Sequence, residues 1–181
     1  VGENGAYKMQ GSAVCIDNET GYVVAIVGGR EQEELGIYTL NRAYQSHRQP
    51  GSSIKPLIVY TPFFELGNNP DTIIMDEAIE GGPKASYYYG AVATRLAVEK
   101  SLNPAAWKLY SQLTPEVGLQ YLKDMHFTEI RSEDYVNATA LGGFTKGTSA
   151  VEMAAGFATL ENDGKYRTPT CIKKIVDAAE N

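Results

Sequence analysis

The chain has 181 residues, 43% of them hydrophobic, which is enough to form a globular domain with a buried core and excludes a disordered tail. Its net charge of −6 argues against a nucleic-acid partner, because phosphates require a basic protein face. The longest apolar run, VVAIV at residues 23–27, is far shorter than the roughly 20 residues that span a bilayer. The first residues also lack the apolar stretch of a secretory signal. These features predict a soluble segment, and a piece of a longer protein would show the same features.

Residues 12–29 predict a β-hairpin around the turn DNETG. Its second strand is apolar at five consecutive positions, so we expect it to be covered on both faces. Residues 30–47 are polar without a clear period and predict a connecting segment.

A helix is expected from about Ser52, since Pro56 is tolerated in a first turn, where backbone N–H groups lack partners. Pro62 should kink or shorten this helix, which we expect to end near Gly67.

The second half of the chain predicts turns and helices. Residues 68–90 are rich in turn signals, and residues 91–100 read as a helix with Val92 and Leu96 on one face. Further helices are expected after the Asn103–Pro104 step, after Thr114 as N-cap, and after Ser149, which forms a capping box with Glu152. The tail 166–176 returns to a strand-like pattern. A hairpin followed by helices predicts an α+β fold, in which an antiparallel sheet packs against a mainly helical region.

The sequence has only two cysteines and two histidines, which limits the metal and redox chemistry that it can support. Cys15 and Cys171 are too few and too far apart for a metal site, and His47 and His126 do not form an H-E-x-x-H pair. We therefore expect no metal and no cofactor. The cysteines are predicted to be semi-buried thiols, with a single disulfide as the alternative.

The stretch RQPGSSIKPL, residues 48–57, places a lysine three positions after a serine. On a helix, Ser52 and Lys55 would share one face. A serine is a weak nucleophile until a base takes its proton, and a lysine serves as base when burial lowers its pKa. The spacing alone is nonspecific, because a polar helix start can produce it by chance.

This stretch and three others in the chain resemble segments of one protein family. RQPGSSIKPL resembles the active-site serine segment of penicillin-binding proteins, above all the bifunctional class A type. EKSLNPAAWKL is similar to that family's Ser-x-Asn motif, carried here by Ser101 and Asn103. ALGGFTKGTSAVEMAAGFATLENDG and the hairpin GSAVCIDNETGYVVAIVGG resemble segments that flank these motifs. The resemblance covers nearly the whole chain, in the family's order.

This resemblance implies a D,D-transpeptidase of peptidoglycan cross-linking with a serine-acyltransferase architecture. Ser52 would attack the D-Ala-D-Ala stem peptide and would also be acylated by β-lactam antibiotics. Lys55 would be the base, Ser101 would relay the proton to the leaving amine, and Asn103 would orient Lys55 and bind the substrate amide. The full-length protein would be anchored to the bacterial membrane and act on its outer face.

The family's third motif, Lys-Thr-Gly, does not occur in this sequence. Residues 1–181 are therefore expected to form the first part of a transpeptidase domain, without the third-motif strand, the rest of the domain or the glycosyltransferase domain. Alone, this piece is expected to be inactive or weakly active. Lys146, in the sequence TKGT, superficially suggests the third motif, but it precedes a capping box and is expected in a solvated loop.

Two alternatives remain at this point. A serine β-lactamase or β-lactam sensor would share the first two motifs and would differ in turning over the antibiotic. The other alternative is a non-catalytic binding or scaffold module with a degenerate site, and a piece without the third motif would behave in this way. A helix-breaking cap before Pro104 is the alternative interpretation of Ser101 and Asn103.

Overall fold

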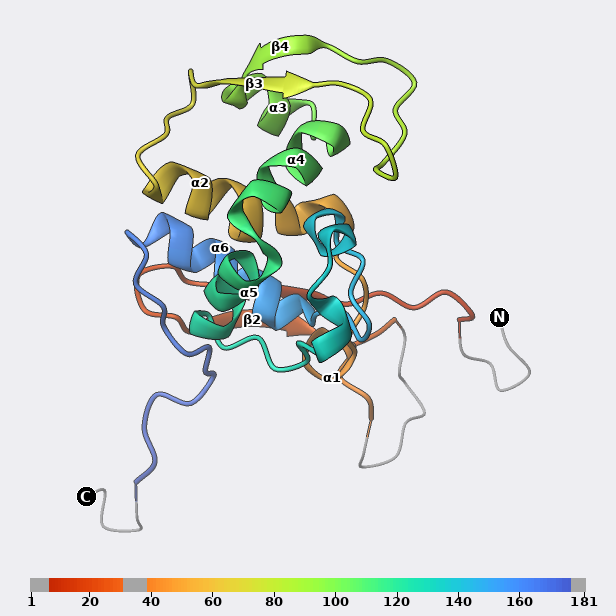
Figure 1. The fold of residues 1–181 in the computed structure, drawn as a ribbon. Coiled ribbons are helices and arrows are strands. Elements are labelled where there is room, and N and C mark those ends of the chain that lie inside the picture. The colour runs from red at the N-terminus through yellow and green to blue at the C-terminus, as the bar shows by residue number, and fades with distance from the viewer. Residues whose placement is uncertain (1–6, 31–38, 177–181) are drawn as a thin grey trace. The chain divides into compact units, whose positions relative to one another are not determined.

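We describe the chain from a computed structural model that covers residues 7–30 and 39–176 (Figure 1). The chain divides into two compact units, which we describe separately. The first unit comprises residues 1–47 and 149–181, and the second comprises residues 48–148. The expected assignment of residues 1–181 to one partial domain stays a prediction.

The first unit begins with the predicted hairpin. Strands β1 (Ala13–Ile16) and β2 (Val23–Val27) pair antiparallel, with Ala13 opposite Val27. The turn between them is closed by Asp17, whose carboxylate accepts hydrogen bonds from the Thr20 amide at 2.8 Å and hydroxyl at 2.7 Å. A turn residue of this kind satisfies backbone groups that the strands leave free.

The expectation that β2 is covered on both faces is wrong for this chain. Val24 is 62% exposed and Val27 54% exposed, although the strand is apolar throughout. In the described part of the chain, β1 is the only strand that pairs with β2, and the tail adds a single bridge between Tyr22 and Thr170. The tail 166–176 is thus not the strand that its pattern predicted, because one bridge does not form a ladder.

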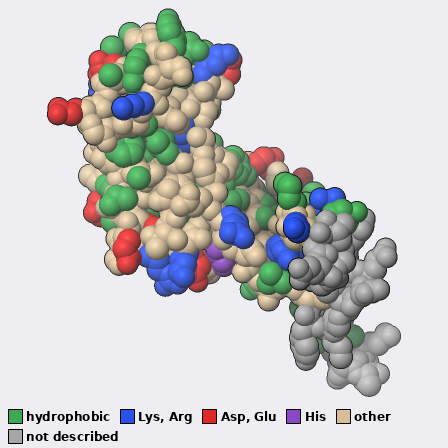
Figure 2. Space-filling view, turned by 90° about the vertical axis from the view of Figure 1, so that its right-hand side faces the viewer, with side chains coloured by type: hydrophobic (Ala, Val, Ile, Leu, Met, Phe, Trp, Pro, Cys, Tyr) green, Lys and Arg blue, Asp and Glu red, His purple; other side chains and the backbone are tan. Residues whose placement is uncertain are grey.

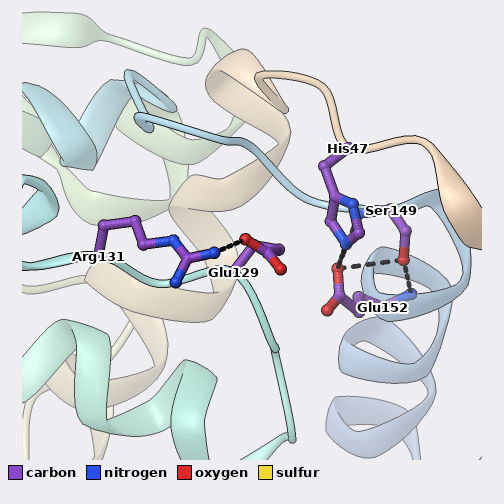
Figure 3. A network of polar contacts seen from close by, with 5 residues as sticks. All are labelled: His47, Glu129, Arg131, Ser149 and Glu152. Atoms are coloured by element: carbon purple, nitrogen blue, oxygen red, sulfur yellow. Dashed lines mark hydrogen bonds and ion pairs between the residues drawn. The ribbon is translucent and has the colours of Figure 1, made fainter.

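Helix α6 (Ala150–Glu161) packs beside β1 and beside the short helix α1 (Arg42–Gln45), which the sequence did not predict. Its predicted capping box is confirmed: the Glu152 amide donates to Ser149 Oγ at 3.2 Å, and the Ser149 amide donates to Glu152 Oε2 at 2.7 Å. His47 Nε2 lies 3.6 Å from the same Glu152 oxygen (Figure 3).

The second unit is mainly helical. Its centre is a helical run from Gly51 to Glu65, which ends in α2 (Thr61–Glu65). Helices α4 (Asn103–Leu113) and α5 (Pro115–Asp124) pack against this run (Figure 1). The core side chains come from all three segments and from the loop after α5: Leu57, Ile58, Tyr110, Leu119, Leu122 and Phe144.

Two strands lie where turns and a helix start were expected. Strand β3 (Ile73–Asp76) pairs antiparallel with β4 (Gly90–Ala93), and helix α3 (Thr94–Glu99) follows directly. The helix therefore starts later than predicted, and its buried side is formed by Thr94 and Ala97. The combination of short antiparallel strand pairs with helices confirms the α+β class.

Hydrophobic side chains also reach the surface, as the face in Figure 2 shows. They lie mostly on strands and loops, and three of them, Val24, Ile26 and Val27, belong to β2. Among the described residues, none of the helices is both long and apolar enough to cross a membrane.

Candidate active site

The run that carries Ser52 and Lys55 changes its helical type twice. Residues Gly51–Ile54 form a 3-10 turn, Pro56–Tyr60 a π turn and Thr61–Glu65 an α-helix. Pro56 has no N–H for the carbonyl of Ser52, which instead accepts from the Lys55 amide. Pro62 also lacks an N–H. Next to it, the Thr61 amide donates to the Pro56 carbonyl, five residues back, which makes this turn a π turn. The two prolines thus explain why the predicted helix is present but irregular.

Lys55 is buried within this run, with only 1% of its surface exposed. Its ammonium donates to the Ser101 carbonyl at 2.7 Å, to Ser101 Oγ at 3.0 Å and to Asn103 Oδ1 at 2.6 Å. An ammonium has three N–H donors, so its hydrogen-bonding capacity is fully used. Burial nevertheless lowers the pKa of Lys55 to about 8, because the charged form loses its hydration.

A lowered pKa gives Lys55 the property that a general base needs. A pKa of about 8 leaves about a tenth of the amine neutral at pH 7, whereas an ordinary lysine is almost wholly charged. A neutral amine accepts a proton, and the bound Ser101 hydroxyl gives that proton a route onward.

Ser101 reaches Lys55 through an unusual backbone conformation. It follows α3 and has a positive φ of 52°. The Leu102 amide bonds back to the Ala97 carbonyl and the Ser101 amide to Val98, which is the Schellman pattern that usually places glycine at this position. Both the carbonyl and the hydroxyl of Ser101 then accept from the Lys55 amine, and non-glycine residues with such a strained backbone cluster at functional sites.

Asn103 is the first residue of α4, and Pro104 follows it where a missing N–H has no cost. The helix break that the sequence predicted here is therefore real. The same break also places the Asn103 amide oxygen on Lys55, so the two interpretations of this motif are compatible.

Ser52 lies on the surface of the 3-10 turn and is exposed. Its hydroxyl makes no hydrogen bond to any of the residues that the structure describes. The neighbouring Ser53 hydroxyl donates to the Pro50 carbonyl at 2.7 Å. The structure thus joins Lys55, Ser101 and Asn103 directly, while Ser52 lies one helical turn before Lys55 with a free hydroxyl.

The remaining sequence expectations concern Lys146 and the cysteines. Lys146 is exposed in the loop that enters α6, as predicted, and lies on no strand. Cys15 and Cys171 are free, but both are exposed and not semi-buried, because β1 and the tail are thinly covered. Within residues 7–30 and 39–176, no cluster of His, Cys, Asp or Glu could hold a metal ion.

Sequence reasoning missed Asp134, which is fully buried and accepts hydrogen bonds through both carboxylate oxygens. The polar stretch around it, RSEDYVNATA, has no helical or strand period that would reveal burial. Asp76 on β3 is also fully buried, and its Oδ2 accepts from the Tyr89 amide at 2.9 Å. Asp76 lies in residues 68–90, which were expected to form turns, and Asp134 lies in a stretch for which no element was predicted.

The fold and these contacts define a helical site in which a buried lysine is held by the serine and asparagine of a Ser-x-Asn motif. Residues 11–181 match the family described as the penicillin-binding protein transpeptidase domain. The chain belongs to this family.

Named relatives agree with this assignment. The chain is 33% identical over 175 residues to Penicillin-binding protein 4 of Bacillus subtilis, covering 93% of this chain and 28% of that protein. It is 38% identical over 175 residues to Penicillin-binding protein 1F of the same organism, covering 93% of this chain and 23% of the relative. Over 194 residues it is 32% identical to Penicillin-binding protein 1A of Clostridium acetobutylicum, covering 97% of this chain and 24% of that protein. The chain thus spans about a quarter of the length of these relatives, and the class A resemblance is confirmed.

Solved structures agree on the fold. A crystal structure of Penicillin-Binding Protein 1A from Haemophilus influenzae matches with a TM-score of 0.77 and 27% identity, covering 94% of this chain and 26% of that one. The PonA1 protein from Mycobacterium tuberculosis, solved in complex with penicillin V, matches with a TM-score of 0.78 at 22% identity, covering 98% and 50%. The likeness to PonA1, at 22% identity, supports the fold alone.

Proposed function

We propose that the full-length protein is a serine D,D-transpeptidase of peptidoglycan cross-linking, and that Ser52, Lys55, Ser101 and Asn103 act on its donor substrate. The observation that carries the proposal is the buried Lys55 amine, held at 3.0 Å from Ser101 Oγ and 2.6 Å from Asn103 Oδ1. The family assignment supports the same chemistry.

In the acylation step, Ser52 Oγ attacks the carbonyl carbon between the two D-alanines of a stem peptide. Neutral Lys55 takes the hydroxyl proton as the new ester bond forms. Ser101 passes a proton to the amine of the terminal D-alanine as the C–N bond breaks, and D-alanine leaves. Asn103 keeps Lys55 oriented and binds the substrate amide.

In the second step, the amine of a neighbouring stem peptide attacks the ester. A peptide bond forms, the Ser52–acyl bond breaks, and Ser52 recovers its proton. A β-lactam ring would acylate the same hydroxyl, and its amide nitrogen remains attached to the acyl group. The substrates are therefore stem peptides on the outer face of the bacterial cytoplasmic membrane, and residues 1–181 contribute the first two motifs of the domain.

The test is labelling of the full-length protein with a fluorescent penicillin. Ser52→Ala should abolish the label. Ser53→Ala is the matched control, because it removes the adjacent exposed hydroxyl, which bonds only to the Pro50 carbonyl, and should leave labelling within about threefold. Equal labelling of the wild type and Ser52→Ala would refute the assignment, and steady turnover of the penicillin would favour the β-lactamase alternative.

A further inference from the structure

The backbone just before Ser52 lies against a glycine-rich loop, residues 142–148. The Arg48 amide donates to the Thr148 carbonyl at 2.9 Å, and the Thr148 amide returns a bond to the Arg48 carbonyl at 2.8 Å. The Gln49 side-chain amide donates to the Phe144 carbonyl at 3.2 Å. These bonds fix the path of the chain into the 3-10 turn that carries Ser52.

Two glycines of the loop touch this segment backbone to backbone. A β-carbon built on Gly142 would lie 2.3 Å from both the nitrogen and the oxygen of Gly51. One built on Gly147 would lie 2.2 Å from the Arg48 carbonyl carbon. Non-bonded heavy atoms do not approach this closely, so a side chain at either position must shift the loop or the segment that leads to Ser52, and either shift alters the contact between them.

The other side of the loop is fixed by the buried carboxylate of Asp134. Its Oδ1 accepts from the Thr145 amide and hydroxyl, each at 2.7 Å, and its Oδ2 accepts from the Arg131 amide at 2.8 Å. The Arg131 side chain in turn pairs with Glu129 (Figure 3). A carboxylate with several N–H and O–H donors is a strong and directional anchor.

We propose that the loop 142–148, anchored by Asp134, positions Ser52 for acylation. Gly142, Gly147 and Asp134 are positioning residues, because they act through the Gly51 backbone, the Arg48 backbone and the Thr145 side chain. This inference rests on the proposed function and deepens it.

The physical reason is that Ser52 and Lys55 are held from different sides. Lys55 is fixed by Ser101 and Asn103, whereas Ser52 follows Gly51, which rests on the loop. Relieving a 2.2 Å contact requires a shift of about 1 Å, and misplacement of a reacting atom by that distance can slow a reaction about 100-fold.

The test compares two glycines with the same backbone strain. Gly147 has a φ of 92° and Gly67 a φ of 91°, but a β-carbon on Gly67 meets nothing within 4 Å. In the full-length protein, Gly147→Ala should lower the penicillin acylation rate constant about 100-fold, with the dissociation constant of the initial complex changed by less than about threefold. Gly67→Ala should stay within about threefold of wild type in both quantities.

A second pair tests the anchor. Thr145→Val removes the hydroxyl bond to Asp134 and should slow acylation by about tenfold, whereas Thr145→Ser keeps a hydroxyl there and should restore most of the rate. Rates are compared per folded molecule, with the folded fraction measured by thermal unfolding.

Amide hydrogen exchange provides a readout that needs no activity. Exchange of the peptide covering residues 48–55 should rise in Gly147→Ala and not in Gly67→Ala. Equal rates and equal exchange for the two variants would overturn the inference while leaving the proposed function intact. If wild-type Ser52 is not acylated at all, the proposed function fails, and the exchange comparison alone decides whether the loop positions Ser52.

Discussion

Raising the pH should speed acylation of Ser52 and then reach a plateau near pH 9. In the proposed mechanism, acylation requires neutral Lys55, and burial lowers the pKa of Lys55 to about 8. The rate should therefore follow the neutral fraction of this one amine.

The expected size of the effect follows from that pKa. The neutral fraction rises from about 9% at pH 7 to about 91% at pH 9, so the rate should rise about tenfold and then change by only about 10% up to pH 10. A lysine with the ordinary pKa of 10.5 would give about a hundredfold rise between pH 7 and 9 and a further rise of about eightfold by pH 10.

The assay is the acylation rate constant of the full-length protein with a penicillin whose only ionisable group is its carboxylate, measured by quenched mass spectrometry from pH 6 to 10. Ser52→Ala gives the background from alkaline β-lactam hydrolysis. A rate that keeps rising steeply between pH 9 and 10, or one that is flat from pH 6 to 10, would refute Lys55 as a base with a burial-lowered pKa.

Three further predictions concern the same residues. The isolated 181-residue chain should be labelled by fluorescent penicillin slowly or not at all, since it lacks a Lys-Thr-Gly motif, and rapid stoichiometric labelling would contradict this. Lys146→Ala in the full-length protein should change acylation by less than about tenfold, because this lysine is exposed in a loop, and a thousandfold loss with the fold intact would make it a catalytic contact. Lys55 disfavours folding while charged, because its folded pKa of about 8 lies below the unfolded value of about 10.5. The free energy of unfolding should therefore rise by about 3 kcal/mol between pH 8 and 10.5, measured by urea unfolding as the difference from Lys55→Met, and an equal pH dependence in that variant would show that Lys55 is not the cause.

The residues of the candidate site stand in short motifs, but the Ser-x-x-Lys spacing alone is nonspecific, and the family resemblance was needed to select them. Ser52 and Lys55 share one helical run, and the helix break at Asn103 could be read from Pro104. The contact between Lys55 and Ser101 could not be read from local pattern, since it joins two segments far apart in the chain. The family resemblance brought these segments together, and the hydrogen bonds of Lys55 now support that pairing.

The wrong predictions about the fold have physical causes. Residues 90–93, GAVA, suit a strand or a helix start equally, and only pairing with β3 decides between them. The run VVAIV predicted a strand covered on both faces, but periodicity cannot say what is present to cover it. The π turn at Pro56–Tyr60 depends on two prolines acting together, which a helix-propensity argument treats one at a time.

Buried polar anchors were the least predictable feature. Asp134 lies in a stretch that reads as a loop, and its burial depends on the loop 142–148 folding over it. The glycine-rich stretch that contains Gly142 and Gly143 did not show that Gly142 touches Gly51.

The most direct test of the account is to identify the residue that a penicillin acylates. The full-length protein is incubated with penicillin, digested, and the modified peptide is sequenced by mass spectrometry. The account predicts one adduct, on Ser52 in the peptide that contains RQPGSSIKPL, and its loss in Ser52→Ala. An adduct on Ser53, on Ser101 or outside this peptide, with Ser52 unmodified, would contradict it.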